Sequence, residues 1–334
     1  MMRFTMLVTI AAGALCAQAS AATELAEREA IRATVLRLFS ANDFNALEDL
    51  SASYRSTASR TPSGVWHLAL FYAGLNHAIE EAQPPSQGEA AFSEAEHKVQ
   101  RWVAAYPDSP SAHIVYGMLL VARGWSYRGN EYASQVPREA WEPFRRNIAL
   151  ARAYLEEHKS IAAADPHWYK VMLWVAKSEA WDFVEFADLL DEALAREPLY
   201  TETYFSALEY LLPKWHGSAF EIEAFARDAA QRTAARGGSG MYARIYWHLS
   251  LVEYENDLFT ESLVDWPLMR EGFEDVIAEY PVAWNVNNFA RFACLARDKR
   301  KTSELFEQVK DQFVAEAWQP LSLFTECSFW LLLP

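Results

Sequence analysis

Apolar residues between Asp182 and Pro213 recur with the 3.6-residue period of an α-helix. Asp182 stands in the N-cap position before the first apolar stripe, and Glu185 three residues later completes a capping-box pattern. Pro198 ends this helix, because proline disfavours the helical conformation of the residue before it. The first stripe consists of Phe183, Phe186, Ala187, Leu190, Ala193 and Leu194, and the second helix carries Tyr204, Leu208, Leu211 and Leu212. Neither helix can bury its stripe alone, so the pattern predicts a helical hairpin that packs on similar hairpins.

The same order of helix, proline and helix recurs along the chain. It is centred on Pro107, Pro166, Pro198 and Pro281, and an alanine lies three residues before each proline, at Ala104, Ala163, Ala195 and Ala278. An apolar helix follows each proline. The repetition predicts an all-α protein built from helical hairpins.

The N-terminal third follows this pattern less closely. Residues 23–39 and 66–82 read as helices, and the polar, Ser-rich segment between them carries shorter helical pieces. Residues 83–88, with the sequence Gln-Pro-Pro-Ser-Gln-Gly, read as a linker. We therefore predict an N-terminal helical cap at residues 22–82, a linker at 83–88 and a degenerate helical-repeat domain at 89–334.

Residues 1–21 have the pattern of a signal peptide. Arg3 supplies the charged start, an apolar stretch follows, and Ala19-Ser20-Ala21 matches an A-x-A cleavage site. The apolar stretch is shorter than the roughly 20 residues that span a bilayer. This pattern predicts an exported protein, with the periplasm as the expected compartment and secretion as the alternative, and no membrane insertion after cleavage.

The hairpins resemble tetratricopeptide repeats, whose second helix ends just before a proline and whose crossing requires a small residue. Gly117 and Ala176 occupy that small-residue position, and Pro166 and Pro198 are separated by nearly the family's repeat of about 34 residues. The other prolines are farther apart, so the intervening units are degenerate or carry insertions. The resemblance covers about residues 92–313 and implies a right-handed solenoid of tetratricopeptide-like hairpins.

A second resemblance covers three separate segments. Residues 124–132, 211–226 and 266–296 are similar to a family of secreted bacterial helical proteins known only as a domain of unknown function. This resemblance implies a helical fold and an exported location. It implies no reaction and no catalytic residues.

Composition narrows the possible partners. The formal net charge of −15 disfavours binding to nucleic acid or to anionic membrane surfaces. Cys294 and Cys327 follow the predicted cleavage site, and in an oxidising compartment they can form a disulfide worth roughly 3 kcal/mol, or they can be two buried thiols. Neither a metal-ligand pattern nor a nucleotide-binding or hydrolase motif occurs in the sequence, so we expect no metal and no cofactor.

Two loops are candidates for ligand binding. Trp215 and His216 precede Gly217 and Ser218, and this loop can present an aromatic platform beside a polar contact. Arg128 lies in a glycine-punctuated loop and can hold a carboxylate with two hydrogen bonds. Structural roles are the alternative in both cases: a tryptophan that fills the core, and an arginine in a salt bridge.

One helix face is a third candidate. Asn285, Asn288 and Arg291 recur at intervals of three residues, and tetratricopeptide-like grooves can hold peptide carboxylates with such side chains. The alternative is that these residues flank an apolar stripe and bond to neighbouring loops. Together with Arg128, Trp215 and His216 they form the set of predicted binding residues.

Stacked hairpins form a concave groove, so the sequence predicts an exported binding or scaffold protein rather than an enzyme. The groove would present itself to a peptide, a protein or a cell-envelope component. One alternative is an α/α-toroid enzyme that acts on glycans through a carboxylate pair, with Asp182 and Asp265 as acid and base because each lies beside a tryptophan. Another is a structural subunit whose groove is an oligomer interface.

Overall fold

The computed structural model describes residues 7–81 and 88–333, with side chains described for 24–80 and 92–333. Within these ranges the regular secondary structure comprises seventeen α-helices and short 3-10 turns, with no β-strand. The predicted all-α class is therefore confirmed. No helix in the described residues has the length and apolarity needed to cross a membrane.

The chain forms two compact units, and the long helix α1 (Leu7–Ala41) contributes to both. The central unit comprises residues 29–59 and 65–218, and the terminal unit comprises residues 1–28, 60–64 and 219–334. This division differs from the predicted boundary at 83–88, because the helices on both sides of that segment belong to the central unit. Residues 83–87 of the predicted linker lie outside the described residues, as do residues 1–6 of the predicted signal peptide.

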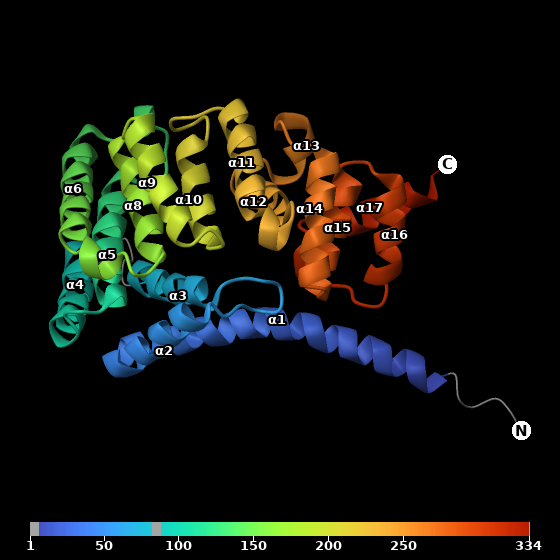
Figure 1. Ribbon diagram of the computed structural model, residues 1–334, viewed down its shortest axis with the longest axis horizontal. Helices are drawn as coiled ribbons and strands as arrows, with labels where there is room; N and C mark the ends of the chain where they lie inside the picture. Colours follow the sequence, from blue (N-terminus) through green and yellow to red (C-terminus); the bar gives the residue numbers. More distant parts are fainter. Residues whose placement is uncertain (1–6, 82–87, 334) are drawn as a thin grey trace, which may run out of the picture. The chain divides into compact units, whose positions relative to one another are not determined.

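The central unit contains most of the predicted hairpins. Its complete helices are α2 (Phe44–Thr57), α3 (His67–Glu81), α4 (Gly88–Ala105), α5 (Pro110–Arg128), α6 (Trp141–Glu157), α7 (Lys159–Ala162), α8 (His167–Glu179), α9 (Phe183–Arg196) and α10 (Thr201–Leu211). Helices α5, α6, α8, α9 and α10 lie alongside one another (Figure 1), and α8 packs against α5, α6, α9 and α10. Helix α8 is therefore surrounded by neighbours.

The terminal unit continues the helical pattern. Its complete helices are α11 (Ala219–Gly237), α12 (Gly240–Val252), α13 (Leu258–Glu261), α14 (Trp266–Glu279), α15 (Ala283–Leu295), α16 (Lys299–Val309) and α17 (Ser322–Leu332). Helices α11, α12, α14, α15 and α16 each pack against the next in this order. The four prolines that were predicted to separate helices all lie between two helices of the same unit.

The α9–α10 hairpin confirms the capping expected from its sequence. The Asp182 carboxylate accepts hydrogen bonds from the backbone N–H groups of Val184 and Glu185, at 2.9 and 3.0 Å. The inward face of α9 buries Phe186 and four aliphatic residues. Phe183 was expected on this buried stripe, but its side chain is 58% exposed. It lies in the first turn, where its ring centre is 6.5 Å from that of Phe186.

Gly117 occupies the crossing of α5 and α6, as expected for a position that requires a small residue. A Cβ atom added there would lie 2.6 Å from Cδ2 of Leu155, which is closer than real Cβ atoms approach other groups. Leu155 itself is fully buried. The glycine therefore lets the two helices approach closely at this point.

A buried carboxylate joins four segments of the central unit. Asp165 precedes α8 and is fully buried. Its Oδ2 atom accepts hydrogen bonds from Arg55 of α2 and from Tyr72 of α3, both at 2.8 Å, and Oδ1 accepts from the backbone N–H of His167 at 2.9 Å. Tyr72 also bonds to Ser111 of α5. Burial raises the pKa of Asp165, while the charge of Arg55 opposes this shift.

The terminal unit incorporates the short segment 60–64 through polar contacts. Glu24 of α1 is fully buried and accepts hydrogen bonds from Arg28, Thr61 and Ser63. Burial acts to raise the pKa of Glu24, but hydrogen bonding by Ser63 and the charge of Arg28 outweigh burial and lower this pKa. Arg244 of α12 donates to the Ser63 carbonyl oxygen at 3.1 Å, so a second helix also holds this segment.

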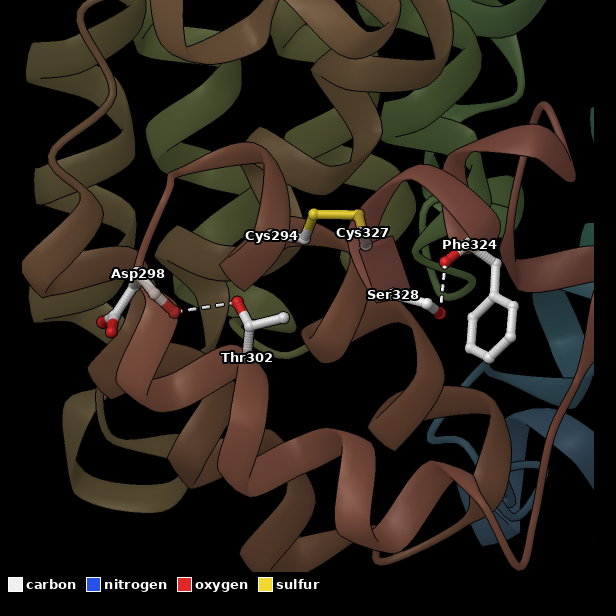
Figure 2. The surroundings of a disulfide bond; sticks show 6 residues. All are labelled: Cys294, Asp298, Thr302, Phe324, Cys327 and Ser328. Atoms are coloured by element: carbon white, nitrogen blue, oxygen red, sulfur yellow. Dashed lines mark hydrogen bonds between the residues drawn. A yellow bond between two sulfur atoms is a disulfide. The ribbon is translucent and has the colours of Figure 1, made fainter. Parts of the chain in front are cut away.

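A disulfide joins Cys294 of α15 to Cys327 of α17, with Cα atoms 6.0 Å apart (Figure 2). The structure thus contains the pairing that the sequence left open. Between the two cysteines, Thr302 bonds to the carbonyl oxygen of Asp298 in the first turn of α16. The bridge closes a loop with a sequence separation of 33 residues and ties the last helix to the unit.

Candidate ligand-binding site

A cavity of about 540 Å³ opens in the central unit. Its walls come from the C-terminal end of α5, the loop that follows, the start of α6, the second half of α8, and the end of α10 with its following loop. Its aromatic lining residues are Trp125, Tyr132, Trp141, Phe144, Trp174 and Trp215. We call it the tryptophan cavity, since four of these six are tryptophans.

The loop after α10 is folded back by tight backbone contacts. Trp215 N donates to the Leu212 carbonyl oxygen at 2.8 Å, and His216 N donates to that of Tyr210 at 3.2 Å. A Cβ added to Gly217 would lie 2.2 Å from the carbonyl oxygen of Leu211, so only glycine fits at this position. This return of the chain places Trp215 and His216 against α8.

Arg128 is 5% exposed and lies among three of the tryptophans. Its guanidinium carbon is 4.9 Å from the ring centres of Trp125 and Trp215 and 5.5 Å from that of Trp141. The Nη1 group donates to the carbonyl oxygens of Gly129 and Glu131, at 2.9 and 3.2 Å. Burial lowers the pKa of Arg128, but an arginine keeps its charge at neutral pH. The expected alternative of a salt bridge is absent from the described part of the chain.

Lys177 of α8 lies on the same aromatic surface. Its Nζ atom is 3.5 Å from the ring centre of Trp174 and 5.0 Å from those of Trp125 and Trp215. It also pairs with Glu209 of α10 at 3.3 Å. Burial lowers the pKa of Lys177 to about 8, and Glu209 only partly offsets that effect. A buried lysine with a perturbed pKa inside a cavity is a feature of functional sites.

The lowered pKa of Lys177 predicts a rise in stability with pH. Between pH 8 and 10.5 the unfolded chain holds a proton on this amine that the folded chain has lost, so folding is favoured as the pH rises through this interval. From about pH 7 to about pH 9.5 the free energy of unfolding should rise by about 2 kcal/mol relative to the Lys177→Met variant. Urea unfolding followed by circular dichroism measures both proteins. Equal changes in the two would show that Lys177 titrates near its ordinary pKa.

A smaller cavity of about 230 Å³ adjoins the tryptophan cavity and shares Trp125, Asn130 and Trp174 with it. Its other lining residues come from α3, α5 and the first half of α8, among them Lys170. The two cavities lie next to each other along α8. Lys170 and Lys177 both lie over the ring of Trp174, with their Nζ atoms 5.7 and 3.5 Å from its centre.

Three predicted binding residues meet in the tryptophan cavity. Arg128, Trp215 and His216 all line it, although they lie far apart in the sequence. Arg128, which was expected in a loop, is the last residue of α5, whereas Trp215 and His216 belong to the loop after α10. His216 Nε2 donates to the carbonyl oxygen of Lys177 at 3.1 Å, so the imidazole also fastens the loop to α8. Sequence reasoning missed Lys177, because nothing in its local sequence distinguishes it from other lysines.

The other three predicted binding residues belong to the terminal unit and are buried on α15. Asn285 donates to the carbonyl oxygens of Ser63 and Tyr280, and Asn288 donates to that of Trp284. Arg291 Nη2 donates to the side-chain oxygen of Asn256 at 2.9 Å. These bonds match the structural alternative considered for this face, and its role in binding stays a prediction.

The two carboxylates of the alternative enzyme hypothesis both cap helices. Asp182 caps α9, and Asp265 caps α14 by accepting a hydrogen bond from Leu268 N while pairing with Arg227 at 2.9 Å. Such caps contribute about 1 kcal/mol each. No group of three or more His, Cys, Asp or Glu residues suited to a metal ion occurs in the described ranges.

The capping role of Asp182 gives a direct prediction. Asp182→Ala should lower the free energy of unfolding by about 1 kcal/mol, because two backbone N–H groups of α9 lose their acceptor. Asp182→Ser is the matched control and should cost only a few tenths of that, since serine also caps helices. Urea unfolding of both variants measures the difference. A serine variant as unstable as the alanine variant would contradict the capping role.

Comparisons of the chain with protein-family models, with curated proteins and with solved structures found no match. The resemblances to tetratricopeptide repeats and to the secreted bacterial family therefore stay predictions. The residues of the cavity itself are the basis for a functional proposal.

Proposed function

We propose that this protein is a helical-repeat binding protein whose tryptophan cavity holds a peptide or a segment of a partner protein. The observation that carries the proposal is the pair of adjoining cavities along α8, which share Trp125, Asn130 and Trp174. A cleft with an aromatic lining and a few polar groups is the usual form of a binding site.

The spacing of the lining residues on α8 suits an extended segment. Lys170, Trp174 and Lys177 lie at i, i+4 and i+7 on one face of α8, a distance of about 10 Å along the helix axis. About three residues of an extended peptide cover that length. Tyr132 is 69% exposed and lines the tryptophan cavity, so it is available to contact a bound chain.

We propose in addition that the hairpins stack as a right-handed, tetratricopeptide-like solenoid. The packing of α8 against α5, α6, α9 and α10 supports this arrangement, as does the close crossing at Gly117. Solenoids present extended concave surfaces to their partners.

Export to the periplasm completes the proposal. The signal-peptide pattern of residues 1–21 supports it, and so does the disulfide between Cys294 and Cys327, because such bonds persist in oxidising compartments. A protein or a cell-envelope component of the same compartment is then the expected partner.

Photo-crosslinking in cells tests this function. The photoreactive residue p-benzoylphenylalanine replaces Tyr132 at the cavity, and in a control protein it replaces Leu251, which is 62% exposed on the terminal unit. The proposal predicts one stoichiometric protein adduct at position 132 that is absent at position 251. The adduct should disappear when Trp215→Ala is added.

Other outcomes would contradict the proposal. Glycan fragments retained at position 132 without a protein adduct would favour the enzyme alternative. A protein adduct insensitive to Trp215→Ala, or equal adducts at both positions, would show that the cavity is not where the partner binds.

A further inference from the structure

Two residues of the tryptophan cavity have N–H groups without an acceptor among the described residues. The Nε and Nη2 groups of Arg128 have no hydrogen-bond partner in the described part of the chain, since only Nη1 bonds to carbonyl oxygens. The indole Nε1–H of Trp215 is buried and also unpartnered among the described residues. Leaving a buried donor such as this indole N–H unpaired costs about 1–3 kcal/mol, so it indicates that an acceptor is missing. The two Arg128 groups are not fully buried, so a ligand can reach them.

The net charge of the cavity lining is opposite in sign to the net charge of the whole chain. Arg128, Lys177 and Lys214 line it together with the carboxylates of Glu131 and Glu209, which leaves one net positive charge, while the whole chain carries −15. The lysines Lys214 and Lys170 help to lower the pKa of Lys177, as expected where positive charge is concentrated. The lining therefore favours a ligand that carries a single negative charge.

A cationic ligand is disfavoured at this site. The aromatic faces that attract cations are already occupied by the protein's own groups: Arg128 lies over Trp125, Trp141 and Trp215, and Lys177 lies over Trp174. An incoming cation would meet these charges at close range. An anion would complete their coordination.

We infer that the tryptophan cavity binds a carboxylate carried on a flat apolar group, with Arg128 and the indole N–H of Trp215 as its donors. The guanidinium presents a planar pair of N–H groups that matches the two oxygens of a carboxylate. The aromatic walls, including Phe144 and Tyr132, accept the apolar part. This inference rests on the proposed function and specifies which group of a bound segment enters the cavity.

A set of small isosteric probes tests the inference with the purified full-length protein. Phenylacetate carries the charge, phenylacetamide has the same shape without it, and benzylamine carries the opposite charge. Calorimetric titration at about pH 7 should show phenylacetate binding roughly tenfold or more tightly than phenylacetamide, as expected for a charge-assisted hydrogen bond. Benzylamine should show no binding. Equal affinities for phenylacetate and phenylacetamide would overturn the inference.

Three variants locate the donors. Arg128→Met should weaken phenylacetate binding roughly tenfold or more and leave phenylacetamide binding unchanged. Arg146→Met is the matched control, because Arg146 lies exposed on α6 and pairs with Glu142. Trp215→Phe keeps an aromatic ring but removes the indole N–H together with part of the ring surface, so it tests the second donor if the Arg128 variant does not fold. The change in phenylacetamide affinity in the same variant measures the effect of the lost ring surface. Unchanged phenylacetate affinity in a folded Arg128→Met or Trp215→Phe protein would also overturn the inference.

A second comparison separates a side-chain carboxylate from a chain terminus. N-acetyl-phenylalanine carries a terminal carboxylate, whereas N-acetyl-glutamyl-phenylalanine amide carries a side-chain carboxylate and no free terminus. Whichever of these two compounds binds identifies the source of the carboxylate. If neither compound binds and phenylacetate does not bind either, the inference is overturned. Phenylacetate binding without a protein adduct at position 132 would instead contradict the peptide-binding function alone.

Discussion

Asp165→Ala is expected to lower the free energy of unfolding by about 3–5 kcal/mol, because it removes one partner of a buried ion pair. The guanidinium of Arg55 would lose its carboxylate, and the hydroxyl of Tyr72 and the backbone N–H of His167 would lose an acceptor. These groups belong to α2, α3 and α8, so one side chain joins three helices of the central unit. Since α8 carries Trp174 and Lys177, we also expect the tryptophan cavity to lose its ligand affinity.

Urea unfolding followed by circular dichroism measures this effect. Asp188→Ala is the matched control, since it removes an exposed carboxylate from α9 and should change the free energy of unfolding by less than about 0.5 kcal/mol. A loss of less than about 1 kcal/mol in Asp165→Ala would show that the ion pair is not required for the fold of the central unit.

Replacing both Cys294 and Cys327 with alanine is expected to lower the free energy of unfolding by roughly 3.5–4 kcal/mol. The disulfide closes a loop with a sequence separation of 33 residues, and cross-linking a loop of that size restricts the unfolded chain by this amount in the chain-entropy model. Both cysteines are buried, so the substitution also removes some packing at α15 and α17.

Reduction of the wild-type protein by dithiothreitol provides the control for this prediction. Reduction breaks the disulfide and keeps both side chains. It should therefore lower the free energy of unfolding by most of the amount that is lost in the double variant. Binding at the tryptophan cavity should persist in the double variant under conditions in which it is folded, because the bridge lies within the terminal unit. A double variant within about 1 kcal/mol of wild type would contradict the assigned role of the bridge.

The parts of the fold that were predictable depend on local sequence. Asp182 and Pro198 mark the start and end of α9 through a cap and a steric conflict, which both act within a few residues. Gly117 was identifiable because helices that cross closely need a small residue. The prediction that Phe183 is buried was wrong. Its position fits the period of the apolar stripe, but its exposure depends on how far the neighbouring helices extend.

The candidate site was only partly predictable, because its residues come from separate helices. Arg128 and Trp215 stood out through nearby glycines and aromatic character, but their contact depends on the packing of α5 beside α8 and on the turn at Gly217. Lys177 gave no local signal, since its burial results from Trp174, Trp215 and α10 together. The contacts of Glu24 with residues 60–64 were missed for the same reason.

An NMR titration shows directly whether the tryptophan cavity is the ligand site. The segment recovered by crosslinking at position 132, made as a synthetic peptide, is added to protein with ¹⁵N-labelled tryptophan indoles. If the peptide binds there, the indole resonances of Trp125, Trp141, Trp174 and Trp215 should shift and saturate. The resonances of Trp247 and Trp266 in the terminal unit should stay unchanged. Binding that shifts only Trp247 or Trp266 would show that the cavity is not the ligand site.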